Sequence, residues 1–241
     1  MTQETVLTFE EAAALLRRYR QTILHEADEP GLARRSAKAA RQDVGLTETG
    51  VLIVTGSNDW RDYLFYNLRP NRSVPPMPEL DRLVTPDLPL RAYHQGFLLH
   101  AARVLAFLGD DRPTFIIGHS LGAATAQILG TVLDVPTIAF AAPQPVRRRF
   151  LKAAPLRDRA HVQWNTFNIA WRQDFVTRGF RLLGFRCLGH RKVLDLDHNN
   201  LGIDHFMDDY ARLLRADAAR GEARVVPDRW RTALDLPDRL A

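Results

Sequence analysis

One short pattern, a serine flanked by glycines two positions before and after it, restricts the fold of this chain more than any other feature. It occupies residues 118–122, with Ser120 at its centre. The apolar run 114–117 comes directly before it, and an alanine-rich segment with helical spacing begins at Ala123. A strand that turns at once into a helix needs small residues at these flanking positions, and it exposes the central side chain at the carboxyl edge of a sheet. The pattern therefore predicts a parallel sheet with Ser120 at its carboxyl edge.

Strand-like and helix-like segments alternate along the chain. We predict strands at 51–54, 114–117, 137–141, 162–167 and 192–196, and helices at 9–27, from about 60, 96–108, 123–133 and 205–214. This alternation is typical of a mainly parallel central sheet with helices on both faces. Together with the serine turn it predicts an α/β-hydrolase fold.

The length of 241 residues fits one α/β domain spanning 1–241. Within it we distinguish an N-terminal helical segment, 1–48, and a charged C-terminal tail, 215–241. Thr8 and Glu11 are spaced to form a capping box at the start of the first helix. Residues 28–49 are poor in large hydrophobic side chains, so we expect a loop there with one exposed helix at 32–42.

Composition excludes several classes of function. The single cysteine, Cys187, cannot form an intramolecular disulfide, and no Cys/His spacing typical of a metal site is present. The start of the chain lacks a secretory pattern and no apolar run is long enough to cross a bilayer, so we expect a cytoplasmic protein, with signal-independent export left open. The net charge is +5, but the arginines are scattered except at 147–149, which argues against a nucleic-acid module. The oligomeric state stays open.

A serine hydroxyl needs a histidine base to act as a nucleophile, and that base needs a carboxylate. We predict His205 as the base, because it begins the predicted helix 205–214 after a glycine-containing loop. His190 and His198 lie in predicted polar loops, and His161 precedes its predicted strand at the opposite edge of the sheet.

Asp174 is the predicted acid. It follows the predicted strand 162–167 by a short loop, at the carboxyl edge, and gives the chain order serine, aspartate, histidine. Asp197 and Asp204 are its rivals. Asp197 is more simply a solvated turn residue, and the side chain of Asp204 should diverge from the neighbouring ring of His205.

Two backbone N–H groups are expected to stabilise the oxyanion that forms during acyl transfer. Leu121, directly after the serine, supplies the first. The loop 55–57 could supply the second, because Gly56 permits a turn and Ser57 offers both an N–H and a hydroxyl. The alternative for this loop is an ordinary turn in which Ser57 caps the next helix.

Taken together, these residues resemble the fungal-type class 3 lipase family of the α/β-hydrolase superfamily. Four motifs carry the resemblance, in matching order: the oxyanion loop 54–57 with Trp60 and Asp62, the histidine-x-glycine-phenylalanine helix start 93–97, the serine turn 118–122, and the strand end 141–143. Residues 174–176 resemble the Asp-x-Val segment of the family's acid, and 205–210 its histidine-bearing last helix. The resemblance implies that Ser57 and Leu121 supply the oxyanion N–H groups.

The chain also departs from the family pattern. Thr55 stands where an arginine is usual before the glycine, and Thr177 where a proline is usual after Asp-x-Val. His94 belongs to a family motif, but we interpret it as a structural hydrogen-bonding residue outside the triad, because it is distant from the serine turn in sequence.

The resemblance implies a lid in the interval 69–90. Six prolines between residues 70 and 89 predict an absence of regular structure there. The interval contains seven apolar residues that could cover an acyl-binding cleft: Val74, Met77, Leu80, Leu83, Val84, Leu88 and Leu90. The alternative is an irregular surface loop.

The sequence thus predicts a serine carboxylic-ester hydrolase, in which Ser120 attacks the ester, His205 is the general base, and an acyl-enzyme forms without a metal or organic cofactor. The resemblance implies a triacylglycerol lipase or a related acylhydrolase, with a lipid or ester substrate. A phospholipase, a small-ester or thioester hydrolase, and a non-catalytic lipid-binding or protein-binding module are the alternatives. Arg147, Arg148 and Arg149 could contact anionic head groups transiently, or simply form a solvated helix start.

Overall fold

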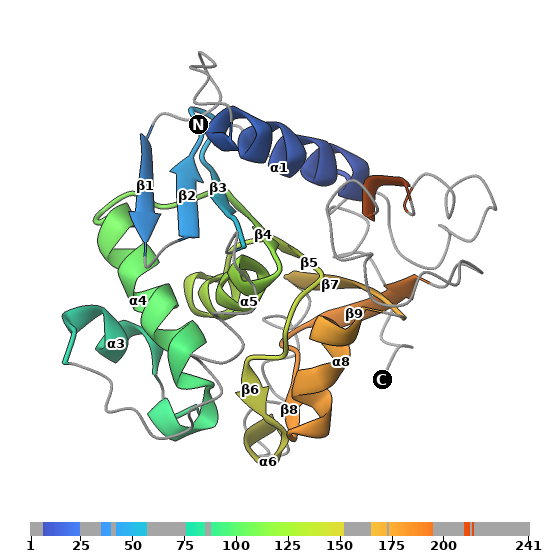
Figure 1. The fold of residues 1–241 in the computed structure, drawn as a ribbon. Helices are drawn as coiled ribbons and strands as arrows, with labels where there is room; N and C mark the ends of the chain where they lie inside the picture. The colour runs from blue at the N-terminus through green and yellow to red at the C-terminus, as the bar shows by residue number, and fades with distance from the viewer. Residues whose placement is uncertain are drawn as a thin grey trace.

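The computed structural model describes residues 7–24, 35–39, 42–56, 76–84, 88–151, 165–172, 174–194, 210–212 and 214 (Figure 1). For 22–24, 35–39, 42, 175 and 178 it describes the backbone alone. Within these ranges, no helix is both long and apolar enough to cross a membrane.

A seven-stranded sheet runs through the described part of the chain, in the order β1-β2-β3-β4-β5-β7-β9. Its strands are β1 Arg35–Ala39, β2 Gln42–Leu46, β3 Val51–Val54, β4 Phe115–His119, β5 Thr137–Phe140, β7 Thr166–Trp171 and β9 His190–Leu194. The first two pairings are antiparallel, and those from β3 to β9 are parallel. The carboxyl ends of five strands therefore meet at one edge.

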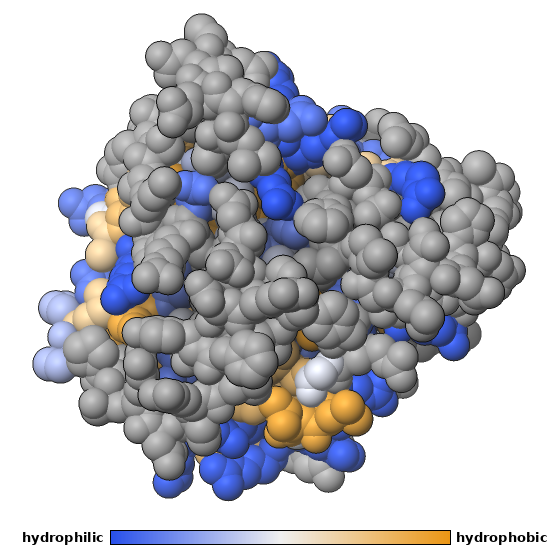
Figure 2. Space-filling model, viewed as in Figure 1, coloured by the Kyte–Doolittle hydropathy of each residue, from blue (hydrophilic) through white to orange (hydrophobic). Residues whose placement is uncertain are grey.

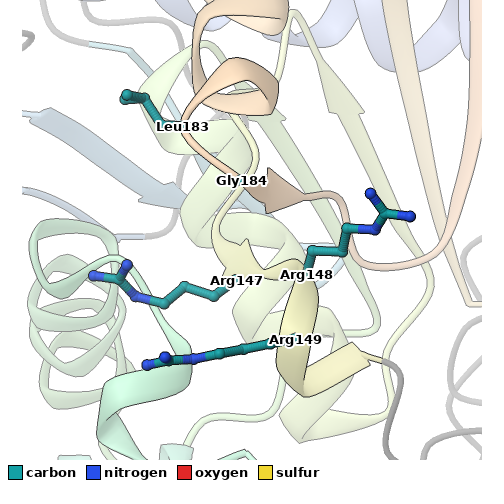
Figure 3. Close-up of a pocket in the computed structure, with 5 residues that line it drawn as sticks. All are labelled: Arg147, Arg148, Arg149, Leu183 and Gly184. Atoms are coloured by element: carbon teal, nitrogen blue, oxygen red, sulfur yellow. The ribbon is translucent and has the colours of Figure 1, made fainter.

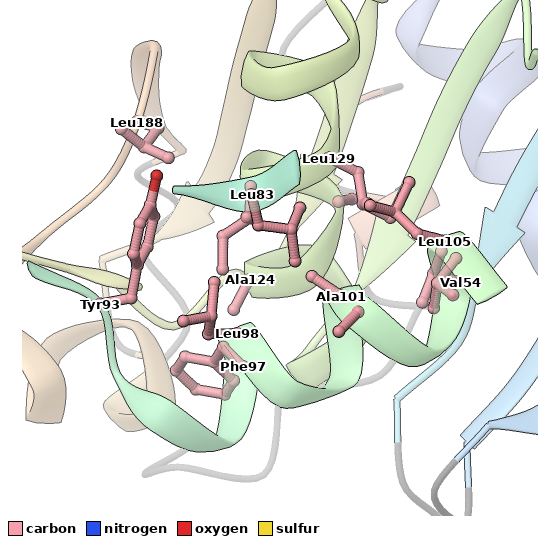
Figure 4. Packing of buried hydrophobic residues seen from close by; sticks show 14 of the residues in the cluster. Val54, Leu83, Tyr93, Phe97, Leu98, Ala101, Leu105, Ala124, Leu129 and Leu188 are labelled. Carbon is pink, nitrogen blue, oxygen red and sulfur yellow. The ribbon is translucent and has the colours of Figure 1, made fainter. Parts of the chain in front are cut away.

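Helices cover both faces of this sheet. Alternate residues of the buried strands enter two separate cores, as the period of a strand requires. Leu52, Val54 and Ile116 pack with α3 Pro78–Leu83, α4 Gln95–Leu108 and α5 Leu121–Leu133. Val51, Ile53 and Ile117 pack with α1 Phe9–Leu24 and with the helical residues Tyr210 and Leu214. Figure 4 shows the first core, in which Leu83, Leu98 and Ala124 gather from three helices. This arrangement is an α/β-hydrolase fold, as predicted.

Smaller elements lie beyond the carboxyl edge of the large sheet. The short helix η1 Leu90–Ala92 precedes α4, and β6 Val146–Arg147 with α6 Arg148–Leu151 follows β5. The helix α8 Phe175–Leu182 follows β7, and β8 Phe185–Arg186 pairs with β6 in a separate two-stranded sheet. Figure 1 shows α8, β8, β6 and α6 below the large sheet, at the opposite end of the molecule from α1.

The first helix begins where the predicted capping box lies. The backbone N–H of Thr8 donates to Oε2 of Glu11 at 2.7 Å, and the N–H of Glu11 donates to Oγ1 of Thr8 at 3.1 Å. These two bonds satisfy N–H groups that a helix start leaves without partners, so the predicted start of α1 is confirmed.

The expected exposed helix at 32–42 is wrong, because the structure forms the hairpin of β1 and β2 there. The reason is long-range pairing. Val44 and Leu46 of β2 are buried, and β2 pairs along β3. The edge strand β1 in turn pairs with β2, so this segment is extended because of its neighbours in the sheet and not because of its own residue types.

The prediction that residues 70–89 lack regular structure is also wrong in part, since α3 occupies Pro78–Leu83. Pro78 stands in the first turn of this helix, where no N–H is needed and the fixed backbone angle of proline favours the helix. Leu80, Leu83 and Leu88 are buried in the first core, whereas Leu90 is exposed. The described part of the predicted lid is thus partly core.

Two predicted strands are shifted. The strand predicted at 162–167 is β7, which runs from Thr166 to Trp171. The strand predicted at 192–196 is β9, which begins at His190, a residue predicted to lie in a loop. Asn168, in the middle of β7, is buried, and its side-chain amide donates to the carbonyls of Leu188 and His190 at 2.6 and 3.0 Å. A buried polar residue interrupts the apolar alternation, which explains the misplaced boundary.

Candidate active site

Ser120 stands between the end of β4 and the start of α5, as the glycine-flanked pattern predicted. Its backbone adopts φ 54° and ψ −122°, a conformation that costs energy for any residue with a Cβ atom. A Cβ atom at Gly118 would lie 2.6 Å from Cα of Ala123, and one at Gly122 would overlap the carbonyl oxygens of Val54 and Thr55. Both glycines are therefore required by close backbone approach, and the strained turn holds the Ser120 side chain at the carboxyl edge.

The loop after β3 lies directly against this serine. A Cβ atom at Gly56 would lie 2.8 Å from Cβ of Ser120 and 3.4 Å from its Oγ. Thr55 anchors the loop: its backbone N–H and its hydroxyl both donate to the carbonyl of Asp43 at 3.0 Å, and its Oγ1 accepts from the N–H of Asp43 at 3.2 Å. Thr55, which replaces the family's arginine, thus holds the loop to β2.

The two predicted oxyanion donors lie in different parts of the chain. Leu121 is the first residue of α5, so its backbone N–H belongs to a helix N-terminus directly after Ser120. Ser57 follows Gly56 but lies outside the described residues.

Asp174 lies at the same edge, after β7, and is 3% exposed. It caps α8: Oδ1 accepts from the N–H of Val176 at 2.9 Å. The hydroxyl of Thr177 donates to the backbone carbonyl of Asp174 at 2.9 Å. The threonine that replaces the family's proline therefore fixes the first turn of α8 with a hydrogen bond.

A tyrosine that the sequence patterns did not single out holds the second oxygen of this carboxylate. The Tyr210 hydroxyl donates to Oδ2 of Asp174 at 3.0 Å and accepts from the N–H of Trp171 at 3.0 Å. Tyr210 is fully buried, and burial together with the nearby charge of Asp174 raises its pKa well above the usual value, so the hydroxyl keeps its proton. A tyrosine on the predicted last helix was the available signal, since a buried hydroxyl needs a partner.

Two of the described histidines, His190 and His100, make their printed side-chain contacts with residues other than Ser120. His190 lies at the start of β9, opposite Phe167 near the start of β7, so it belongs to the amino edge of the sheet. Its ring stacks on Phe167 with centroids 5.4 Å apart, and burial lowers its pKa. His100 is buried, with Nδ1 2.7 Å from Oγ1 of Thr125.

His94, which precedes α4, packs among aromatic rings, with centroids 4.6 Å from Phe97, 5.5 Å from Phe180 and 5.7 Å from Phe185. Its backbone N–H donates to the carbonyl of Pro145 at 2.8 Å. Both contacts agree with the structural role predicted for it. The other residues weighed for the triad lie outside the described residues: His161, His198, His205, Asp197 and Asp204.

Within the described ranges, no three His, Cys, Asp or Glu side chains gather as metal ligands would. Cys187 is half-buried, and burial raises the pKa of its thiol to about 11, so the thiol is protonated at neutral pH.

A serine turn after β4 and a buried carboxylate after β7, on a mainly parallel sheet, define the class of fold, the α/β-hydrolases. A comparison with models of protein families finds no match. A comparison with curated proteins finds none either.

Solved structures with a similar fold include three fungal lipases. The Lip2 lipase of Yarrowia lipolytica has 16% identity and a TM-score of 0.45, and the match covers 70% of this chain and 65% of that one, less than two thirds of its length. A lipase propeptide complex of Rhizomucor miehei has 15% identity and a TM-score of 0.47, over 80% and 70% of the chains. Lipase II of Rhizopus niveus has 14% identity and a TM-score of 0.48, and the match covers 79% of this chain and 83% of that one.

Proposed function

We propose that this protein is a serine ester hydrolase that acts on lipid-like carboxylic esters. The observation that carries the proposal is the strained left-handed turn at Ser120, which holds a hydroxyl at the carboxyl edge where Asp174 also lies. Ser120 is only 5% exposed, and backbone strain at such a turn is typical of functional sites rather than of ordinary turns. Ser120 is the nucleophile, His205 the general base and Asp174 the carboxylate that orients the base.

The reaction proceeds by acyl transfer. Oγ of Ser120 bonds to the ester carbonyl carbon as its proton moves to His205, and the carbonyl oxygen becomes an oxyanion. The C–O bond to the alcohol then breaks, and His205 gives the proton to the leaving alkoxide. Water, deprotonated by His205, attacks the acyl-enzyme, and the carboxylic acid leaves as Ser120 regains its proton.

The chain itself supports His205 as the base. Tyr210 is bonded to Asp174, and His205 precedes it by five residues, which span at most about 17 Å. A spacing this short permits contact between His205 and the carboxylate. His190, its rival among the described residues, lies at the opposite edge of the sheet.

The oxyanion is stabilised by the N–H of Leu121 and by that of Ser57. The first stands at the N-terminus of α5, where the helix dipole favours negative charge. The second follows Gly56, a position where an added Cβ atom would lie 2.8 Å from Cβ of Ser120. Both donors are backbone groups, so they cost no rearrangement when charge develops.

Hydrolysis of p-nitrophenyl esters of increasing acyl length tests this function. We expect hydrolysis that is faster on long chains and that falls by roughly 10⁴-fold or more in Ser120→Ala, because the nucleophile is lost. Thr131→Ala is the matched control: it removes a hydroxyl from the far end of α5, where Oγ1 donates to the carbonyl of Gln127, and it should keep the activity.

Other outcomes separate the alternatives. Activity on short chains alone makes the protein an esterase, and preference for phospholipids or thioesters makes it a phospholipase or thioesterase. A folded protein without activity on any of these esters contradicts the proposal and favours a binding module.

A further inference from the structure

Three consecutive arginines gather beside two exposed leucines on the surface. Arg147, Arg148 and Arg149 span the junction of β6 and α6, and with Leu183 and Gly184 they line an open hollow of about 450 Å³. We call Arg147, Arg148, Arg149, Leu182 and Leu183 the basic-apolar patch. Figure 3 shows the side chains of Arg147 and Arg149 extending in one direction and that of Arg148 in the other.

The patch is built by backbone pairing, not by chance proximity of flexible side chains. Arg147 pairs with Phe185 across β6 and β8, and the N–H of Arg148 donates to the carbonyl of Gly184 at 2.9 Å. Gly184, at φ 83°, makes the reversal that brings the end of α8 back to β8. The arginines and the leucines are therefore held side by side.

The apolar part of the patch is open to solvent. Leu182 is 88% exposed and Leu183 56% exposed, the two highest values among the exposed large hydrophobic residues of the described part. Figure 2 shows an apolar area at the lower edge of the molecule, in the region of α8 in Figure 1, bordered by hydrophilic side chains. Two neighbouring leucines at such exposure cost free energy in water unless a partner covers them.

The arginines of the patch contact aromatic rings, and these contacts do not neutralise their positive charge. In the described ranges, the guanidinium of Arg147 lies 5.0 Å from the Phe185 ring centroid and that of Arg149 lies 4.9 Å from that of Phe150. Such contacts orient a guanidinium without neutralising it. Burial lowers the pKa of the nearby Arg186, and the positive charges of Arg148 and Arg181 lower it further. An anion at the patch would relieve this repulsion.

The patch lies beyond the carboxyl edge of the sheet, the edge that carries Ser120. Asp174 caps the first turn of α8 and Leu182 ends the same helix, whose eight residues span about 12 Å. β6 likewise follows the carboxyl end of β5. A surface that binds the patch is therefore placed at the edge where the candidate active site lies.

We propose that the basic-apolar patch docks the protein on anionic lipid surfaces and so presents the carboxyl edge to the membrane. The benefit of this orientation for catalysis rests on the proposed function, whereas the binding itself does not. Guanidinium groups bind lipid phosphates with paired hydrogen bonds. Leu182 and Leu183 enter the boundary between head groups and acyl chains. A nucleic acid offers phosphates but no apolar layer for these two aliphatic side chains.

Vesicle co-sedimentation tests the docking directly. The Ser120→Ala protein is used, so that binding is measured without hydrolysis of lipid. It is mixed with vesicles of phosphatidylcholine alone or of phosphatidylcholine with phosphatidylglycerol, and we expect binding to the mixed vesicles that weakens as salt is added.

Two sets of substitutions locate the binding surface. Replacing Arg147, Arg148 and Arg149 by glutamine should weaken binding on the order of a hundredfold, about fivefold for each arginine. The matched control removes the same charge with Arg17→Gln, Arg18→Gln and Arg112→Gln, exposed residues on α1 and before β4, and should change binding little. Leu182→Ser with Leu183→Ser, which leaves the charge unchanged, should weaken binding about tenfold.

The outcomes separate this inference from the proposed function. Absent binding to the mixed vesicles overturns the docking, as does equal loss in the patch and control variants. A third outcome also overturns the docking in favour of a nucleic-acid surface: the three arginine substitutions abolish binding of a short DNA duplex but leave vesicle binding unchanged. Vesicle binding by Ser120→Ala, with no hydrolysis of a water-soluble ester by the unsubstituted protein, supports the docking and contradicts the esterase.

Discussion

The turn at Ser120 and the carboxylate at Asp174 lie at the same edge of the sheet but are held by different interactions. Ser120 is fixed by backbone contact: Gly118 and Gly122 let strand, helix and the end of β3 approach closely. Asp174 is fixed by hydrogen bonds, one of them from Tyr210, which is 36 residues away in sequence. The first arrangement is local and steric, and the second is long-range and polar. The two should therefore respond to different substitutions.

The largest expected effect is a loss of kcat, without loss of the fold, when Asp174 is replaced. Asp174→Asn removes the charge that orients the base but can still accept from the N–H of Val176, so we expect kcat to fall by roughly 10⁴-fold while the fold persists. Asp134→Asn is the control, because Asp134 is exposed, accepts from Asn165, and has a left-handed backbone that asparagine tolerates. Steady-state kinetics and circular dichroism measure both variants. Unchanged kcat in Asp174→Asn moves the acid elsewhere.

The next effect tests the steric side of the comparison. Gly122→Ala pushes a methyl group into the carbonyls of Val54 and Thr55, so the free energy of unfolding should fall by about 3 kcal/mol, with loss of activity. Gly179→Ala is the matched control in α8: a Cβ atom there meets nothing within 4 Å, and the protein should become more stable by about 0.5 kcal/mol. Urea denaturation reads both. Equal stability of the two variants would mean that the turn is not held by close contact.

A smaller effect tests the polar side. Tyr210→Phe leaves the N–H of Trp171 and one oxygen of Asp174 without their partner, so we expect a loss of about 2 kcal/mol of stability and a lower kcat. Tyr19→Phe is the contrast, because the Tyr19 hydroxyl is buried with no hydrogen-bond partner among the described residues. Its removal should leave stability unchanged or raise it by about 1 kcal/mol. The idea is contradicted if both phenylalanine variants lose the same stability.

The smallest effect concerns pH. Burial lowers the pKa of His190 below its usual 6.5 in the folded chain. As the pH falls below 6.5, the unfolded chain takes up a proton that folded His190 resists, so the stability due to the neutral ring is lost on acidification. His190→Gln should therefore show a shallower fall in urea midpoint from pH ~7 to pH ~5.5 than the unsubstituted protein. An equally steep fall in both proteins removes His190 as a cause.

The same contrast explains what the sequence could predict. The turn at Ser120 and the capping box at Thr8 and Glu11 depend on neighbouring residues, so their spacing was sufficient. The β1–β2 hairpin depends on pairing with β3, and Val44 and Leu46 alone make too short an apolar alternation to predict a strand. Pro78 was interpreted as a helix breaker, although a proline in the first turn favours a helix.

The polar half of the site was harder to predict because its partners are distant in the chain. Asp174 was predicted by its place after a strand, and the structure places it there, although β7 begins later than expected. The bond from Tyr210 and the anchoring of Thr55 on Asp43 join residues that only the fold brings together. His205 and Ser57 remain predictions.

The central claim is that the strained turn makes Ser120 a reactive nucleophile. Labelling of the intact protein with a fluorophosphonate, followed by mass spectrometry of its peptides, tests this claim most directly. We predict one label per chain, located on Ser120 and absent from Ser120→Ala. A folded protein that takes no label, or that carries the label on another residue, would contradict the account.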